Sequence, residues 1–326
     1  MGSGVNVLIW HVHGSWTTSF VQGGHNYVVP VVPDRGPDGR GRARTWDWPE
    51  NVVELAPDEL ADAEIDVIVV QREHELELAN AWLGGRRPGS DIPLVWLEHN
   101  APQGRINEMQ HPARGRDDVA VVVHVTATNA LYWDTGSTPA MVIEHGVIDP
   151  GRQWTGERRA LGVVINEPVR RGRVTGTDLI AMFGRWSSID VFGIGVESLA
   201  SELGHPSWLH VHEDLCQARM QAALATRRCY LHPFRWTSLG LALIEAMMLG
   251  MPVVALATTA VPDAVPQGCG IVSNDLCVLR DGVSRIAADR DFAMGLGEAA
   301  RSHAIRRFAL DRFLSEWSEL LEVTCR

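Results

Sequence analysis

The sequence predicts an α/β protein of two domains, each built on a parallel sheet, from three observations. Short apolar runs rich in β-branched residues alternate with segments of helical length along the chain. The runs are apolar throughout rather than alternating, as expected for strands with both faces buried. The 326 residues exceed one ordinary domain and fit two. Strands and helices that alternate in this way form βαβ units, so we expect two Rossmann-like domains.

The first series of strands predicts an N-terminal domain over residues 1–150. A helical segment at 72–83 lies among its strands, which we place at 5–10, 26–32, 66–71, 93–98, 119–125 and 140–147. Asp149-Pro150-Gly151 interrupts the pattern, and a polar stretch follows it. Because proline and glycine end regular structure, we place the domain boundary there.

The second series predicts a C-terminal domain over residues 151–309. Two helices are expected at 238–249 and 291–308, and the strands at 160–166, 189–194, 208–212, 228–232, 252–257 and 270–273. The last segment, 310–326, has one apolar face made by Phe313, Leu314, Trp317, Leu320 and Leu321. This pattern predicts an amphipathic helix, which we expect to pack back on the first domain.

The charges exclude several classes of protein. Asp and Glu number 40, and all 29 basic residues are arginine, which gives a net charge of −11. Without lysine the chain has neither a Walker A loop nor a pyridoxal-phosphate Schiff base. Residues 1–150 hold 10 Arg against 21 Asp and Glu, and the remaining residues hold 19 of each. We therefore expect no nucleic-acid partner, no stable membrane association, and no polyanionic acceptor at the first domain.

Cysteine usage and the N-terminus indicate a cytoplasmic protein. The five cysteines are odd in number, all lie in the second half, and none forms a C-x-x-C motif. A disulfide framework and a cysteine zinc site are therefore not expected. No basic segment precedes the first strand, so we expect no signal peptide. The longest apolar stretch, 239–257, is interrupted by Glu245 and Pro252 and is interpreted as a buried helix followed by a strand.

The strongest functional signal is the signature segment 232–254, HPFRWTSLGLALIEAMMLGMPVV. It predicts a strand end, a turn, and a helix whose N-cap is Thr237 or Ser238. The first free amides of such a helix favour an anion, and they would belong to Ser238, Leu239 and Gly240. Glu245 lies in an apolar context, where a buried carboxylate needs partners. Two ribose hydroxyls would satisfy both of its oxygens, whereas a purely structural buried Glu is the alternative.

The second signal is the arginine loop, residues 164–178, VINEPVRRGRVTGTD. It follows the first predicted strand of the second domain and precedes a helix. Guanidinium groups match phosphate oxygens well, so Arg170 and Arg171 are the first candidates to bind a diphosphate, and Arg173 is the next. A solvated basic loop is the alternative.

Histidines form the third signal. His11-Val12-His13 follows the first strand, which is also how a metal-dependent hydrolase begins, and His210 and His212 could add ligands. We favour instead that His13 and His99 line a binding cleft. His124 ends a strand and is assigned to the same cleft, with a structural role as its alternative. Asp289-Arg290-Asp291 is interpreted as solvated charge rather than a metal site.

These motifs resemble retaining glycosyltransferases of family 4, which have the GT-B fold. Glu245 matches the second Glu of the family's Glu-x7-Glu motif, and Thr237 replaces the first. Four further segments are similar to family motifs: 142–149 to "VIxNGVD", 296–308 to "LGxxAR…F", 96–100 to the strand that ends in a sugar-contacting His, and 11–15 to the first N-domain loop. The resemblance covers most of the chain.

The resemblance implies two domains that face each other across a cleft and retention of anomeric configuration. It places His99 beside the sugar, Gly14 and Ser15 beside the diphosphate, and Glu245 on the ribose. It implies a GDP- or UDP-hexose donor, with GDP-mannose favoured because the chain resembles actinobacterial polysaccharide enzymes. No tightly bound cofactor and no catalytic metal are expected. The acidic first domain predicts a soluble oligosaccharide or small glycoside as acceptor.

Two alternatives stay open. Loss of the first motif Glu at Thr237 would suit a catalytically weak homologue that binds a nucleotide or glycan without transfer. A metal-dependent hydrolase would use His11 and His13 instead.

Overall fold

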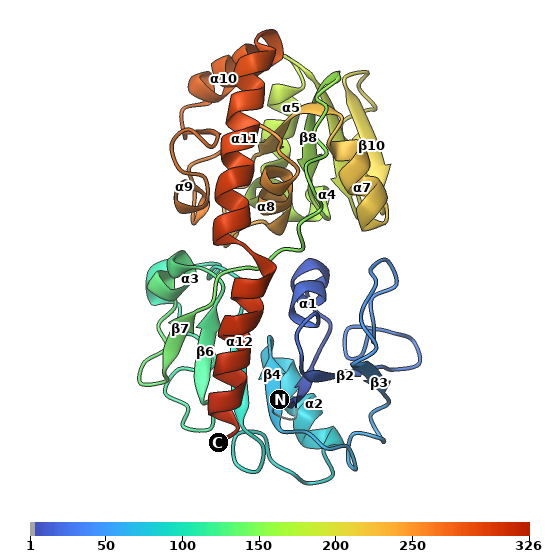
Figure 1. The fold of residues 1–326 in the computed structure, drawn as a ribbon, viewed down its shortest axis with the longest axis vertical. Helices are drawn as coiled ribbons and strands as arrows, with labels where there is room; N and C mark the ends of the chain where they lie inside the picture. The colour runs from blue at the N-terminus through green and yellow to red at the C-terminus, as the bar shows by residue number, and fades with distance from the viewer. Residues whose placement is uncertain (1–3) are drawn as a thin grey trace. The chain divides into compact units, whose positions relative to one another are not determined.

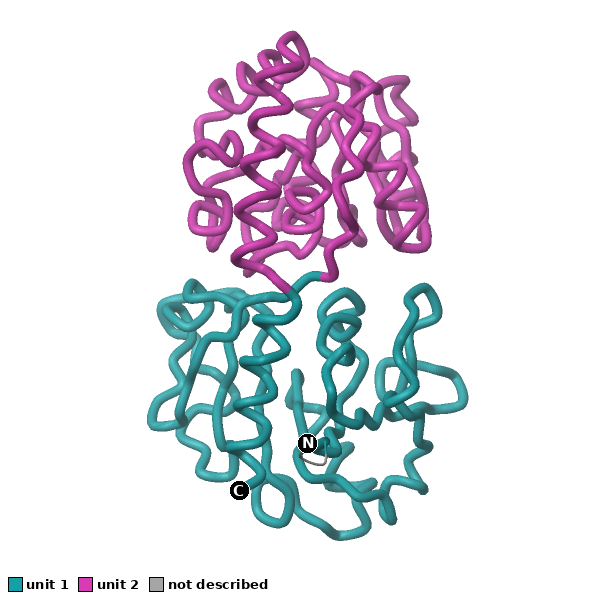
Figure 2. The backbone as a smooth tube through the Cα atoms, in the orientation of Figure 1, with its two compact units in different colours: residues 1–147, 310–326 teal, residues 148–309 magenta. Residues whose placement is uncertain are grey.

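The computed structural model describes residues 4–326 and divides the chain into two compact units (Figures 1 and 2). Unit 1 comprises Met1–Val147 and Leu310–Arg326, and unit 2 comprises Ile148–Ala309. Within the described residues, no helix is both long enough and apolar enough to cross a membrane.

Unit 1 is built on a seven-stranded sheet in the order β3-β2-β1-β4-β5-β6-β7, and every pairing is parallel. The strands are β1 (Asn6–Ile9), β2 (Asn26–Pro30), β3 (Val52–Leu55), β4 (Val67–Val70), β5 (Leu94–Glu98), β6 (Val121–His124) and β7 (Ala140–Val142). Its helices are α1 (Gly14–Phe20), α2 (Glu73–Trp82), η1 (Ile106–Glu108), α3 (Ala127–Tyr132) and α12 (Leu310–Thr324).

Unit 2 is built on a six-stranded parallel sheet in the order β10-β9-β8-β11-β12-β13. The strands are β8 (Arg158–Val164), β9 (Ser188–Gly193), β10 (Leu209–Glu213), β11 (Arg227–His232), β12 (Val253–Ala255) and β13 (Ile271–Val272). The helices are α4 (Pro168–Arg171), η2 (Gly172–Thr175), α5 (Thr177–Phe183), α6 (Glu197–Glu202), α7 (Gln217–Leu224), α8 (Leu241–Met248), α9 (Val261–Ala264), α10 (Leu276–Ala288) and α11 (Arg290–Arg307).

The predicted α/β class with two Rossmann-like sheets is confirmed, whereas several element bounds are wrong. The strand expected at 140–147 ends at Val142. The residues after it pack on α12 instead of pairing, because Arg312 donates to the carbonyls of Glu144 (3.0 Å) and His145 (2.7 Å). Strand β3 was not predicted, and several helices were given no bounds, the longest of them α10.

The C-terminal helix α12 packs on α1 within unit 1, as its apolar face predicts (Figure 1). The Trp317 ring lies 5.6 Å from that of Trp16 and 5.0 Å from that of Phe20, edge to face in both pairs. A Cβ on Gly146 would come within 2.3 Å of Phe313, so only glycine fits beside this helix. Buried aromatic pairs of this kind contribute packing energy beyond their area.

A buried ion pair lies within the sheet of unit 2. Arg227 on β11 reaches across β8 and donates to Asp190 on β9 (2.5 Å), and His212 on β10 contacts the same carboxylate (2.7 Å). The Arg227 guanidinium also lies 5.0 Å over the Phe192 ring. Burial alone would raise the pKa of Asp190, but the hydrogen bonds from Arg227 and His212 hold it below its ordinary value.

Candidate functional site

The carboxyl edge of the unit 2 sheet brings the arginine loop and the signature segment together. β8 leads into the arginine loop, and its neighbour β11 leads into residues 233–240. The backbone amides of Arg235 and Trp236 both donate to the carbonyl of Val174 (2.9 and 3.1 Å). Gly176 makes this approach possible: its φ is +77°, and a Cβ there would lie 2.0 Å from the carbonyl oxygen of Pro233.

The predicted arginines differ in their partners. Arg170 forms an ion pair with Glu167, and Arg173 forms one with Asp178 (2.7 Å). Arg171 is partly buried, and no hydrogen bond or ion pair of its guanidinium exists among residues 4–326. Burial and the neighbouring charge of Arg170 lower the pKa of Arg171, and Glu167 opposes them only weakly. Of the three arginines in this loop, Arg171 is therefore the one whose positive charge, unpaired within the described residues, a bound anion would neutralise.

A glycine pair that the sequence analysis missed completes this edge. Gly193 ends β9 with φ +144°, and a Cβ there would lie 2.1 Å from the Ile165 carbonyl oxygen. The next residue, Ile194, exchanges hydrogen bonds with the start of the arginine loop, at Asn166 (2.9 Å) and Glu167 (2.7 Å). The available signal was Gly193-Ile194-Gly195 at the end of the strand predicted at 189–194, because close backbone approach at a strand end requires glycine.

The start of the signature helix is a correction to the sequence analysis. Helix α8 begins at Leu241 and its N-cap is Gly240, so neither Thr237 nor Ser238 caps it. The helix does not continue toward residue 237, because the backbone of Gly240 is extended, with φ −72° and ψ 120°. Residues 237–240 therefore form an irregular loop, in which Ser238 and Leu239 are buried.

Glu245 lies one turn into α8 and is 5% exposed. Its carboxylate is close enough to Tyr230 to add to the rise that burial causes in the pKa of that phenol. Tyr230 in turn lies beside His232, with 3.4 Å between the phenol oxygen and Nδ1. Burial lowers the pKa of His232 to about 3, so this imidazole is neutral. Three buried polar side chains, those of Glu245, Tyr230 and His232, thus lie close together at the signature segment.

The His232 ring explains why the N-cap is glycine. A Cβ on Gly240 would lie 2.8 Å from Cε1 of that ring. Within the described part of the chain, His232 Nε2 is buried without a hydrogen-bond partner. From the sequence alone, His232 is predicted only as the end of a strand.

In unit 1, the predicted cleft residues His13 and His99 form a histidine cluster with His145. The rings of His13 and His99 lie 4.0 Å apart, and that of His145 lies 6.5 Å from His99. Trp16 packs edge-on against His99 at 5.1 Å. Burial, reinforced by the two other imidazoles, lowers the pKa of His99 well below its ordinary value. His99 is therefore neutral at physiological pH.

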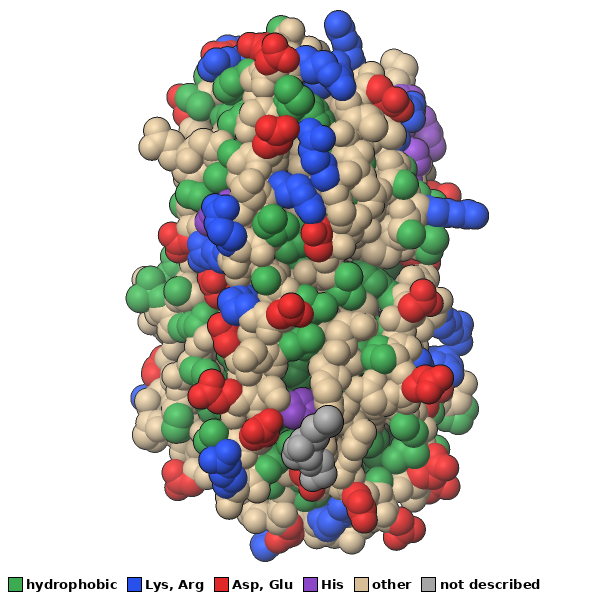
Figure 3. All heavy atoms as spheres, in the orientation of Figure 1, with side chains coloured by type: hydrophobic (Ala, Val, Ile, Leu, Met, Phe, Trp, Pro, Cys, Tyr) green, Lys and Arg blue, Asp and Glu red, His purple; other side chains and the backbone are tan. Residues whose placement is uncertain are grey.

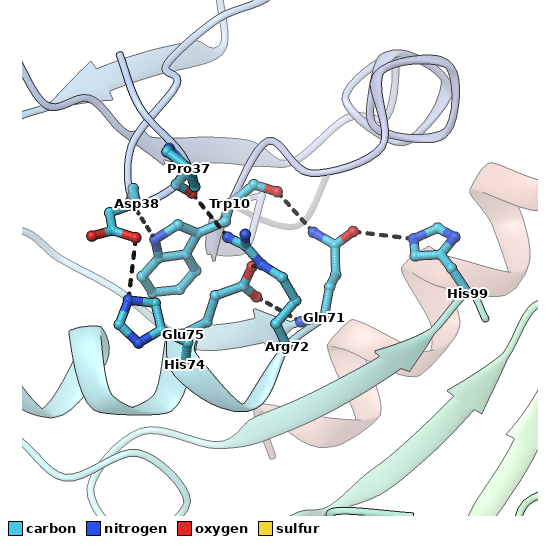
Figure 4. A network of polar contacts seen from close by, with 8 residues as sticks. All are labelled: Trp10, Pro37, Asp38, Gln71, Arg72, His74, Glu75 and His99. Atoms are coloured by element: carbon cyan, nitrogen blue, oxygen red, sulfur yellow. Dashed lines mark hydrogen bonds and ion pairs between the residues drawn. The ribbon is translucent and has the colours of Figure 1, made fainter. Parts of the chain in front are cut away.

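His99 is tied to the chain through Gln71, which follows β4 (Figure 4). Its Nε2 lies 3.1 Å from the side-chain oxygen of Gln71, whose amide nitrogen donates to the Trp10 carbonyl (2.7 Å). The Gln71 backbone amide donates to the buried Glu75 (2.6 Å), which also accepts from Arg72 (2.8 Å).

The other predicted residues of unit 1 lie outside this cluster. His124 ends β6 with no exposed surface, its ring 6.1 Å from His111, and burial lowers its pKa to about 4. Gly14 begins α1, and a Cβ on it would lie 3.8 Å from both His11 Nε2 and Trp46 Nε1. Ser15 follows in the same helix. Their predicted roles at a ligand stay predictions.

No three His, Cys, Asp or Glu side chains of residues 4–326 are grouped so that they could hold a metal ion. His11 contacts the Gly41 carbonyl through Nδ1 (2.9 Å), and His212 contacts Asp190. Asp289 caps α11 by accepting from the Phe292 amide (2.9 Å). These histidines and this carboxylate are engaged in structural contacts.

Comparison with known proteins gives one family and one fold. Residues 190–289, which include the signature helix and Glu245, match the family model "Glycosyl transferases group 1". No curated protein sequence matches the chain.

Three solved structures illustrate the similarity in fold. Sucrose-phosphate synthase from Thermosynechococcus elongatus has a TM-score of 0.73 at 12% identity and covers 98% of both chains. HepE from Anabaena, in complex with UDP and glucose, has a TM-score of 0.69 at 14% identity and covers 97% of this chain and 99% of its own. A glycosyltransferase from Rickettsia africae has a TM-score of 0.68 at 12% identity and covers 99% of both.

At such identities the structures show the fold, and the family match identifies the enzyme class. Residues 190–289 of unit 2 thus resemble the glycosyltransferase group 1 family, and the chain has the α/β fold of the GT-B structures that it matches, which together support a glycosyltransferase.

Proposed function

We propose that this enzyme transfers a hexose from a nucleotide-sugar to a soluble carbohydrate acceptor with retention of anomeric configuration. The observation that carries the proposal is Arg171, a partly buried cation without a carboxylate partner among residues 4–326. It lies in the loop that is bound to the signature segment, at the edge of a parallel sheet where ligands bind. A diphosphate is the anion that suits both features.

In this proposal, unit 2 binds the nucleotide. Arg171 binds the diphosphate directly, and Arg170 and Arg173 add positive charge around it. The backbone of Ser238, Leu239 and Gly240 faces the phosphates, Glu245 accepts hydrogen bonds from the ribose, and Thr237 offers a hydroxyl where the resembled family has its first Glu.

Unit 1 binds the sugars in the same proposal. His99 contacts the transferred hexose, Gly14 and Ser15 lie beside the diphosphate, and His13 and His124 belong to the acceptor side. No protein nucleophile is required, since the leaving phosphate takes the proton of the acceptor hydroxyl. The arginine charges stabilise that phosphate as the glycosidic bond breaks.

The donor is a UDP- or GDP-hexose. The complexes of HepE with UDP and UDP-glucose support uridine, whereas the resemblance to actinobacterial enzymes supports GDP-mannose. We propose that no metal is needed for the chemistry and that the enzyme works in the cytoplasm.

The charge of unit 1 supports a neutral acceptor. Unit 1 holds 12 Arg against 24 Asp and Glu, so an anionic lipid surface would be repelled. We expect the protein to stay in the supernatant when vesicles of anionic lipid are sedimented at physiological salt. Pelleting with the vesicles would overturn the soluble-acceptor proposal.

The first test is thermal unfolding with UDP, GDP, ADP or EDTA. A nucleotide at about 100 times its Kd adds roughly 2.7 kcal/mol, which raises Tm by roughly 5–10 °C for a domain of this size. A rise with UDP or GDP alone and no change with EDTA would support the proposal. A fall with EDTA and no nucleotide effect would favour the metal-dependent hydrolase.

The second test is Glu245→Ala, which removes two hydrogen bonds to the ribose. We expect a loss of about 2–5 kcal/mol in nucleotide binding, measured by titration calorimetry. Unchanged affinity would mean that Glu245 does not hold the donor. Wild-type nucleotide binding without donor turnover would favour the weak homologue, which the replacement at Thr237 supports.

A further inference from the structure

The side-chain amide of Gln71 has only one possible orientation. One of its two ends faces the backbone carbonyl of Trp10, and the other faces the His99 ring (Figure 4). A carbonyl oxygen can only accept a hydrogen bond, so the end at Trp10 must be the NH2 group. The oxygen of Gln71 therefore faces His99, and a flipped amide would oppose two acceptors.

This orientation decides which nitrogen of His99 carries the proton. The Gln71 oxygen accepts, so His99 Nε2 must donate to it. Burial together with the nearby His13 and His145 keeps the ring neutral, which leaves a single proton for the two nitrogens. Nδ1 is therefore unprotonated and can only accept a hydrogen bond.

No other group of the described chain competes for Nδ1. Gln71 is the single hydrogen-bond partner of the His99 ring among residues 4–326. The other groups that face the ring are the imidazoles of His13 and His145 and the edge of Trp16. An acceptor nitrogen thus remains available beside side chains that are aromatic and neutral.

We propose that Gln71 is a positioning residue that holds His99 as a hydrogen-bond acceptor and thereby selects the sugar. A sugar hydroxyl can donate to Nδ1, whereas a carboxylate or a phosphate oxygen has no proton to give and is repelled by its lone pair. The structure therefore assigns this position to a neutral hexose with a free hydroxyl and excludes a uronic acid carboxylate. The inference rests on the proposed function, in which His99 contacts the transferred sugar.

The test uses UDP-glucose and GDP-mannose, and analogues of each in which one hydroxyl at a time is replaced by hydrogen or fluorine. Fluorine can accept a weak hydrogen bond but cannot donate one. At one ring position we expect both replacements to weaken binding equally, by roughly 5–10-fold in calorimetry. Fluoro analogues that bind as tightly as the parent, while deoxy analogues do not, would show that His99 donates and would overturn the inference.

Variants connect this selectivity to Gln71. Gln71→Met has a similar length and releases the His99 tautomer, so the fluoro analogue should regain affinity relative to the parent sugar. Gln71→Glu leaves the Trp10 carbonyl without a donor, and its charge favours a protonated His99 that donates through Nδ1, so the fluoro analogue should regain affinity here too. His74→Ala, at the exposed end of the network in Figure 4, serves as the matched control. All three should bind free UDP or GDP as wild type does, because the proposed function assigns nucleotide binding to unit 2 and Gln71 belongs to unit 1.

Different results would overturn the proposed function and the role of Gln71. Wild-type protein that binds neither nucleotide-sugar would overturn the proposed function and this inference with it. Wild-type protein that binds the sugar, with the same hydroxyl preference in Gln71→Met, would overturn the inference alone.

Discussion

The two units share one architecture and differ in the charge of their candidate groups. Unit 1 is strongly acidic overall, and its candidate cluster is a set of neutral imidazoles around His99. Unit 2 holds 17 Arg against 16 Asp and Glu. In the face shown in Figure 3, arginine and acidic side chains are interspersed over unit 2. Its candidate loop contains the partly buried Arg171, which has no carboxylate partner among residues 4–326.

The comparison teaches that a parallel sheet fixes where a site forms but not its chemistry. Residues after the strand ends supply the site in both units. In unit 1 an amide and aromatic rings suit neutral hydroxyls, whereas in unit 2 guanidinium groups suit an anion. A nucleotide-sugar has one part of each kind.

The largest effect that we expect is on the stability of unit 2, when a buried ion pair is broken rather than an exposed one. Arg227→Met leaves Asp190 buried without its main partner, and we expect a loss of about 3–5 kcal/mol in unfolding free energy. Arg280→Met is the control, since its pair with Asp281 is exposed and should matter by less than about 1 kcal/mol. Urea unfolding measures both. Equal losses would mean that the buried ion pair contributes no more to the unfolding free energy than the exposed one.

The next largest effect that we expect is a loss of folding stability at low pH, caused by the buried histidines of each unit. The pKa values of His124 in unit 1 and His232 in unit 2 are lowered to about 4 and about 3 by burial. Between the unfolded pKa near 6.5 and these values the unfolded chain binds more protons, so stability is complete above about pH 6.5 and is lost as pH falls. Each should cost roughly 2 kcal/mol by pH 5, and His99 adds to unit 1 in the same direction.

Thermal unfolding at pH 7 and pH 5 measures this difference. His124→Leu and His232→Leu should each lose less stability on acidification than wild type. Phe183→Leu, a core change without a titrating group, should lose equally at both pH values. A wild-type protein that is equally stable at pH 7 and pH 5 would contradict the prediction.

Substitutions at two glycines of unit 2 test whether the signature loop takes part in nucleotide binding. Gly176→Ala adds a methyl group against Pro233 and should cost about 2–4 kcal/mol, because the loop must also move. Gly204 has nearly the same φ, +72° against +77°, with nothing near its Cβ position. Gly204→Ala should therefore cost only the backbone strain, about 1–2 kcal/mol, and leave UDP or GDP binding unchanged. Nucleotide binding should weaken in Gly176→Ala alone, as measured by calorimetry.

The smallest effect compares two neighbouring arginines. Arg171→Gln should weaken UDP or GDP binding by roughly 10–100-fold, since a charged hydrogen bond to phosphate is lost. Arg170→Gln should weaken it only a few-fold, because Arg170 is already paired with Glu167. A larger loss in Arg170→Gln would reassign the diphosphate contact. Binding constants from calorimetry decide between them.

Apolar runs predicted both sheets because strands buried on two faces leave an unmistakable local pattern. The same reasoning missed β3, whose four residues include Glu54 and whose pattern is too short to stand out. It placed Arg170, Arg171 and Arg173 in one loop but could not rank them, since the partners Glu167 and Asp178 are chosen by loop geometry. Gln71 carried no signal at all, because its effect on His99 arises between residues 28 positions apart.

Helix α12 has a consequence for how the protein is made. Unit 1 is completed by Phe313 and Trp317, which pack against Trp16. These residues leave the ribosome after all of unit 2, roughly 10–30 s after residue 147 is added. Unit 2 can therefore fold first although it comes second along the chain. During that interval the nascent N-terminal half lacks the two aromatic side chains that cover Trp16.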